Sequence, residues 1–128
     1  MKLILDTHVF IWWVTNPDKL SSRVFDELKN THNDLFLSAV SIWEIVVKVR
    51  LGKLEIDGNL SEHVKGQVEQ NGLLQLSLSP EHVYKLDALE DIHKDPFDRL
   101  LVAQSLYEGA RLVTKDEHIQ RYEVETIW

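Results

Sequence analysis

The chain has 128 residues, of which 44% are hydrophobic and 27% are charged, with a net charge of -7 and no cysteine. This composition predicts a single compact domain over residues 1–128 and excludes a disordered or low-complexity chain. The lack of cysteine excludes a disulfide scaffold, a thiolate nucleophile and a cysteine zinc site, which fits a cytoplasmic protein. The first apolar run is too short for a signal peptide or a membrane span, so we expect no membrane association.

Predicted strands and helices alternate along the chain. The strands are expected at residues 2–5, 35–37, 73–78 and 112–114, with residues 124–128 as a candidate edge strand. The helices are expected directly after Asp6, after Ser21 or Ser22, after Ser38 or Ser41 as far as Gly52, and over residues 61–71, 80–89 and 96–109. Strands that are separated by helices require right-handed crossovers. The pattern therefore predicts an α/β fold with a mainly parallel sheet that helices cover on both faces.

Acidic residues lie near the ends of these predicted elements. Asp6 and Asp116 follow the first and last apolar runs, Asp95 and Asp98 flank a proline, and Glu44 lies near the start of a helix. The carboxyl ends of parallel strands share one edge of the sheet, so these acids are expected to converge there. Converging carboxylates repel one another unless a cation neutralises them, and Mg2+ or Mn2+ prefers such oxygen ligands. The sequence therefore predicts a site for one of these ions.

Two of the acids differ in how well a structural role explains them. Glu44 follows Ser41 by three residues, which is the spacing of a capping box, so helix capping and metal binding both explain it. Asp6 ends a buried strand, where ligands bind in α/β folds. We expect no helix-capping role for Asp6, so metal binding is the preferred interpretation of this residue.

The remaining three acids also have structural alternatives. Asp95 precedes a proline and is the natural N-cap of the helix that begins there. Asp98 would then lie in the first helical turn, where it is the better ligand candidate because Asp95 already supplies the cap. Asp116 could instead cap the short segment that follows it.

Four segments resemble the PIN domain, in particular the VapC-like ribonuclease toxins of bacterial and archaeal toxin–antitoxin pairs. They follow one another over essentially the whole chain as LILDT (3–7), SAVSIWEI (38–45), HKDPFDRLLVAQ (93–104) and LVTKD (112–116). The DPFDRLL stretch is the most specific of them. The resemblance implies a three-layer α/β/α sandwich, cleavage of RNA by a nuclease that needs Mg2+ or Mn2+, an antitoxin partner and a homodimer. It also implies an acidic site made of Asp6, Glu44, Asp98 and Asp116, with Thr7 and Thr114 as supporting hydroxyls.

Basic and aromatic residues beside this site are candidates for contact with RNA. Arg99 and Lys115 are candidate phosphate contacts, and Lys48 is part of a basic helix end that could form a rim. His8, two residues after Asp6, could touch substrate. The tryptophans are more typical of a core or an interface than of base stacking, and Trp12 or Trp13 is expected at the twofold interface.

Two other classes of function stay open at this point. One is a receiver-like signalling module, which also has an acidic pocket at strand ends. That class needs adjacent acids early in the chain, and Asp6 has no acidic neighbour. The other is a catalytically inactive PIN-like scaffold that serves only for binding. The presence of all four acids favours an active nuclease.

Overall fold

The computed structural model describes all residues from 1 to 128 and contains one sheet of five strands in the order β3-β2-β1-β4-β5. All four strand pairings are parallel, as the alternation of strands and helices predicts. The strands are β1 (Lys2–Leu5), β2 (Asp34–Ser38), β3 (Leu74–Leu76), β4 (Arg111–Val113) and β5 (Thr126–Ile127). The predicted edge strand near the C-terminus is therefore confirmed as β5, and β3 is shorter than expected.

Six α-helices and two short 3-10 helices connect these strands. The α-helices are α1 (Thr7–Thr15), α2 (Ser22–Lys29), α3 (Ala39–Arg50), α4 (Leu60–Gln70), α5 (Pro80–Asp87) and α6 (Pro96–Glu108). The 3-10 helices are η1 (Pro17–Lys19) and η2 (Ile119–Arg121). None of the helices is long and apolar enough to cross a membrane.

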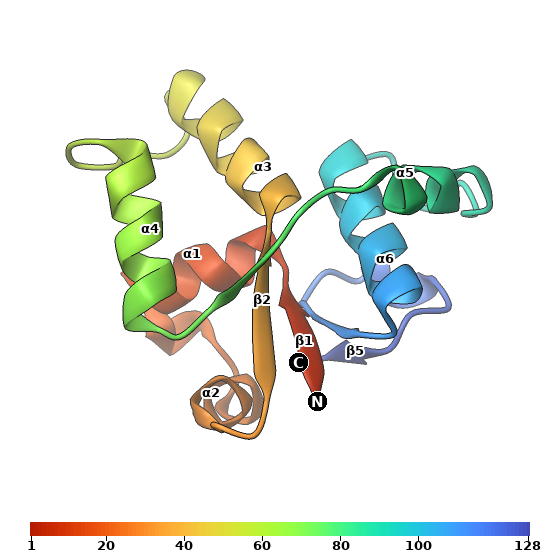
Figure 1. Ribbon diagram of the computed structural model, residues 1–128, viewed down its shortest axis with the longest axis horizontal. Coiled ribbons are helices and arrows are strands. Elements are labelled where there is room, and N and C mark those ends of the chain that lie inside the picture. Colours follow the sequence, from red (N-terminus) through yellow and green to blue (C-terminus); the bar gives the residue numbers. More distant parts are fainter.

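The sheet separates two hydrophobic clusters, because successive residues of a strand point to opposite faces. Leu3 and Leu5 of β1 pack on one side with residues of α1, α2 and α4, whereas Ile4 packs on the other side with residues of α6. Figure 1 shows α1, α2 and α4 on one side of the strands and α5 and α6 on the other. The predicted sheet with helices on both faces is therefore confirmed as three layers.

The order of the strands creates a switch point beside β1. The chain leaves β1 to build β2 and β3 on one side, and later returns to place β4 on the other side of β1. In open α/β sheets, ligands bind outside the carboxyl ends of the strands at such a point. Asp6 follows β1, and Thr114 and Asp116 follow β4, so the chain places polar side chains at this position.

Helix capping resolves one alternative that the sequence leaves open. The Ser38 hydroxyl accepts a hydrogen bond from the Val40 N–H, so α3 begins one turn before the Ser41 alternative would allow. Ser38 Oγ also donates to the side chain of Gln104 on α6. The capping-box interpretation of Glu44 is therefore wrong, since that residue lies within the helix and not in its first turn.

Candidate active site

Asp6 lies in the switch-point position with its carboxylate almost completely buried, at 3% exposure. Its Oδ2 atom accepts a hydrogen bond of 2.7 Å from the Thr114 hydroxyl, which links the ends of β1 and β4. Its Oδ1 atom accepts from the His8 N–H at 3.3 Å and so caps α1, a role that the sequence analysis did not expect. Burial raises the pKa of Asp6, and the hydrogen bond from Thr114 and the nearby His8 act against that rise.

Glu44 on α3 is also buried, at 5% exposure, and only one of its oxygens is paired. The Oε2 atom lies 3.4 Å from the Lys48 ammonium one turn along the helix. The Oε1 atom is buried without any hydrogen-bond partner. An unpaired buried carboxylate oxygen is costly, so this atom indicates a place for a bound cation.

Asp95 and Asp98 share the first turn of α6 and have different roles there. Asp95 caps the helix by accepting a hydrogen bond of 3.0 Å from the Asp98 N–H, as the sequence predicts. Asp98 is left free to face the other acids. Burial and, after it, the negative charges of nearby acids together raise the pKa of Asp98 to about 8, the acids being Asp6, Asp95, Glu44 and Asp116. The acids that the sequence analysis selected therefore lie close enough to interact.

Asp116 divides its two oxygens between a turn and the site. Its Oδ1 atom accepts hydrogen bonds from the N–H groups of His118 and Ile119, which confirms the capping alternative for this oxygen. Its Oδ2 atom lies 3.6 Å from His93 Nε2, so the second oxygen faces the acidic cluster. Asp116 N–H in turn donates to the Thr114 hydroxyl, which thereby connects Asp116 to Asp6.

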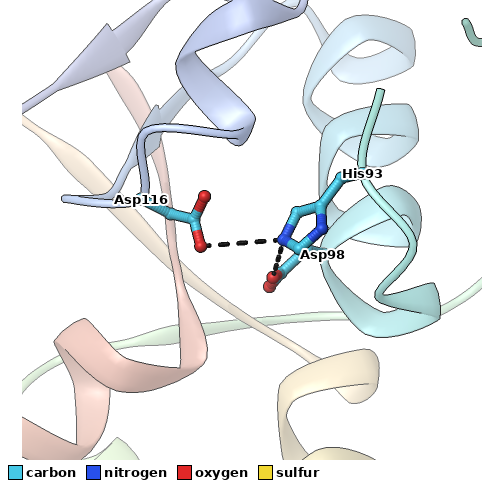
Figure 2. Close-up of side chains that lie close together, drawn as sticks. All are labelled: His93, Asp98 and Asp116. Carbon is cyan, nitrogen blue, oxygen red and sulfur yellow. Dashed lines mark ion pairs between the residues drawn. The ribbon is translucent and has the colours of Figure 1, made fainter. Parts of the chain in front are cut away.

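His93 is a member of this site whose role could not be assigned from the sequence. Figure 2 shows its imidazole between Asp98 and Asp116, and Nε2 lies 2.8 Å from Asp98. The Nδ1 atom accepts a hydrogen bond of 3.4 Å from the Asp95 N–H, so the neutral ring keeps its proton on Nε2. Nε2 faces both carboxylates at ion-pair distance without a hydrogen bond to either, and the three side chains place one potential ligand atom each within 4.8 Å of one another.

Arg99 and Tyr122 hold the loop that carries His93. The Tyr122 hydroxyl accepts from the His93 N–H at 2.9 Å, and one Arg99 nitrogen donates to the same hydroxyl at 3.1 Å. That nitrogen also donates to the carbonyl oxygen of Glu90 at 2.9 Å. The guanidinium therefore has partners within the protein, and we do not retain Arg99 as a candidate RNA contact.

The other supporting residues predicted from the sequence have separate positions. The Thr7 hydroxyl donates to Ser41 Oγ at 2.9 Å, so this buried pair joins α1 to α3 beside the acids. Lys48 lies 3.2 Å from His8 Nε2 in addition to its contact with Glu44. Lys115 is exposed, with its ammonium 5.8 Å from the centre of the Trp128 ring.

The donor set of the cluster fits a hard divalent cation. Carboxylates supply most of the available ligand atoms, with the His93 imidazole beside them, and Mg2+ and Mn2+ both prefer oxygen ligands. Asp6, Glu44, Asp98 and Asp116 are the residues that would hold such an ion. His93, Thr114 and Lys48 would orient or neutralise them from outside.

Comparison with known proteins gives one family and a consistent fold. The family model described as PIN domain matches residues 3–125. Ribonuclease VapC22 from Mycobacterium tuberculosis (strain ATCC 25618 / H37Rv) is 27% identical over an alignment that covers 94% of this chain and 91% of that protein.

Solved structures with the same fold include complexes named VapBC. The structure of VapBC2 from Rickettsia felis, bound to a promoter DNA fragment, aligns with a TM-score of 0.75 and 17% identity, covering 100% of this chain and 99% of that chain. The structure of DNA-bound VapBC from Salmonella typhimurium aligns with a TM-score of 0.71 and 16% identity, covering 99% and 97% of the two chains. At these identities the two alignments support the fold.

We expect the stability of the metal-free protein to depend on pH through Asp98. The folded pKa of about 8 lies above the ordinary value of 3.8, so the stabilising contribution is complete below pH 3.8 and is lost as the pH rises toward 8. The Asp98→Asn variant lacks this loss. Its free energy of unfolding in chelator should therefore gain roughly 1 to 3 kcal/mol over wild type between about pH 5 and pH 8. Urea unfolding across this range measures the difference, with exposed Asp26→Asn as the control. A difference that does not change with pH would contradict the raised pKa.

A second prediction separates the cap from the ligand. Asp95→Ala removes the N-cap of α6 and should lower the free energy of unfolding by about 0.5 to 2 kcal/mol. The free energy of unfolding of Asp95→Asn should stay within roughly a few tenths of a kcal/mol of the wild-type value, because asparagine caps helices as well as aspartate does. Thermal unfolding in chelator tests both variants. Equal losses in both would show that the charge of Asp95, and not its cap, supports the fold.

Proposed function

This chain belongs to the PIN-domain family, and we propose that it is an endoribonuclease that needs Mg2+ or Mn2+ and acts as the toxin of a toxin–antitoxin pair. The observation that carries the proposal is the cluster of Asp6, Glu44, Asp98 and Asp116 at the switch point of the sheet. The name of the curated relative, a ribonuclease, supports the choice of RNA as substrate.

Within this proposal, the four carboxylates hold the metal and the surrounding residues control their geometry. Held by these residues, Mg2+ or Mn2+ would supply an activated water and would neutralise charge on the phosphate. Thr114 fixes the orientation of Asp6, and Lys48 balances part of the charge of Glu44. His93 places Nε2 2.8 Å from Asp98 and 3.6 Å from Asp116, so a protonated imidazole would pair with both carboxylates.

The positive charge that would attract RNA phosphates lies beside the acidic cluster. Lys115 follows Thr114 directly, and Lys48 lies beside Glu44, so both ammonium groups border the acids. A phosphate that reaches the metal would pass within range of these lysines. In this way a chain with a net charge of -7 can still attract RNA at one place.

The toxin assignment adds a protein partner. The solved structures that share the fold include complexes named VapBC, and two of these contain DNA. We infer that an antitoxin binds this chain and suppresses its activity. Co-expression with the product of the neighbouring reading frame should give a complex that does not cleave RNA. The homodimer that the resemblance implies stays a prediction.

The strand order excludes one of the two alternative functions, the receiver-like module, but not the other, the inactive PIN-like scaffold. A receiver-like module has the strand order 2-1-3-4-5, whereas this sheet has the order β3-β2-β1-β4-β5, so that alternative is wrong. An inactive scaffold would have the same fold as an active nuclease. Only a cleavage assay separates these two.

We expect the protein to cleave single-stranded RNA in Mn2+ or Mg2+ and to lose this activity in chelator. Asp98→Asn should reduce kcat/KM by a factor of at least roughly 100, because the amide keeps the shape of the side chain but removes a ligand charge. Asp95→Asn should retain most of the activity, since its cap is preserved. Gel analysis of a labelled RNA measures both variants, with Asp26→Asn as a distant control. Cleavage that persists undiminished in chelator would refute the metal-dependent mechanism.

A further inference from the structure

A cavity of about 330 Å³ opens beside the acidic site, at the switch point of the sheet. Asp6 and Asp116 form part of its lining, so the cavity is continuous with the proposed metal centre. The other lining residues are His8, Trp12 and Lys115, and none of them is needed to hold a metal ion. We name this space the His8–Trp12–Lys115 cavity. Its volume lies at the lower end of the range of small-molecule sites, about 300 to 1,000 Å³.

The aromatic wall of the cavity is fixed by its neighbours. Trp12 lies one turn after His8 on α1, and the centres of their rings are 5.8 Å apart. On another side, the ring of Trp128 meets Trp12 edge-on at 6.0 Å. Trp12 is only half-buried, and the Lys19 ammonium lies 5.7 Å from the centre of its ring, so a base that stacks on this face would displace a flexible lysine side chain. A flat ring that is held in this way is the kind of surface on which nucleobases stack.

The polar wall of the cavity carries donors and positive charge. Lys115 is exposed at its edge, and His8 Nε2 lies 3.2 Å from the Lys48 ammonium. The same imidazole lies 3.9 Å from Asp6 on its Nδ1 side. Ammonium groups contact phosphates and the acceptor atoms of bases. The cavity thus combines an aromatic surface, cationic donors and two acids of the reaction site.

We propose that the His8–Trp12–Lys115 cavity binds the base of one unpaired nucleotide next to the phosphate that is cleaved. This inference rests on the proposed endoribonuclease function and defines its substrate more closely. The occupant must be next to the reacting phosphate because Asp6 and Asp116 belong to both sites. A base inside a duplex cannot enter such a space, so the nucleotide must be unpaired or turned out of its stack. The cavity therefore favours a nucleotide whose base is free to leave the helix, with Trp12 as the stacking surface and Lys115 on the backbone or base edge.

The first test changes the RNA and leaves the protein intact. A short single-stranded RNA with one mapped cleavage site is compared with two versions that carry an abasic nucleotide on one side of the cleaved bond or on the other. With wild-type protein in Mn2+, we expect one abasic version to raise KM about 5- to 100-fold, because its base no longer stacks. The other version should change KM little. The same RNA in a duplex should be a poor substrate.

The second test changes the cavity. Trp12→Ala should raise KM for the intact RNA by a similar factor, Trp12→Phe should recover most of the loss, and the effect on kcat should be smaller. For the abasic RNA that binds poorly, Trp12→Ala should raise KM little further, since the stacked base is already missing. Tyr84→Ala is the matched control, because Tyr84 is an exposed aromatic residue on α5 that does not line the cavity. Thermal unfolding checks that each variant folds.

The outcomes separate the inference from the proposed function. If wild type cleaves RNA but both abasic versions have KM values within about twofold of the intact RNA, no stacked base is bound and the cavity assignment is overturned alone. The same conclusion follows if Trp12→Ala behaves as Tyr84→Ala does. If wild type cleaves no RNA in Mn2+ or Mg2+, the proposed function fails and the cavity assignment fails with it. If Trp12→Ala does not fold, the abasic RNAs with wild type decide the question.

Discussion

The burial of several carboxylates at one edge of the sheet is the constraint on which the rest of the site depends. Burial disfavours a charged carboxylate and the like charges nearby disfavour it further, which is why the pKa of Asp98 rises to about 8. The chain does not remove this cost by pairing every acid with a cation. Glu44 Oε1 is buried with no partner, and Asp98 faces the other acids directly. Buried acids that cost stability in this way are typical of functional sites, where binding or catalysis uses them.

Hydrogen bonds through residues that each contact two members of the site limit how far the acids can move apart. Thr114 is central among them, because its hydroxyl donates to Asp6 and accepts from the Asp116 N–H. Asp95 has a similar double connection on α6, since its side chain caps the Asp98 N–H while its own N–H donates to His93. Each of these residues therefore sets the position of two others. Such links fix the cluster in one arrangement before any ion or substrate binds, which is the preorganisation that catalysis requires.

The sequence predicted the residues at strand ends more reliably than the residues on helices and loops. Asp6 and Asp116 follow apolar runs, and the shared edge of a parallel sheet is enough to bring them together. The role of Glu44 depended on whether Ser38 or Ser41 begins α3. Both residues are serines and therefore cap helices equally well. His93 could not be placed from local pattern, because its orientation comes from Tyr122, which is 29 residues away along the chain. Its signals in the sequence were its position two residues before the Asp95 cap and its place at the start of the HKDPFDRLLVAQ segment.

Charge location reconciles an acidic chain with a nucleic-acid substrate. A net charge of -7 repels RNA from most of the surface, but binding is governed by the field at the place where the phosphates lie. Lys48 and Lys115 come from α3 and from the segment after β4, so they approach the acids from two sides. A divalent ion among the carboxylates would add to their charge and reverse the local sign. The surrounding negative surface then disfavours nonspecific contacts, so RNA binding is concentrated at the edge of the sheet where the chain can act on it.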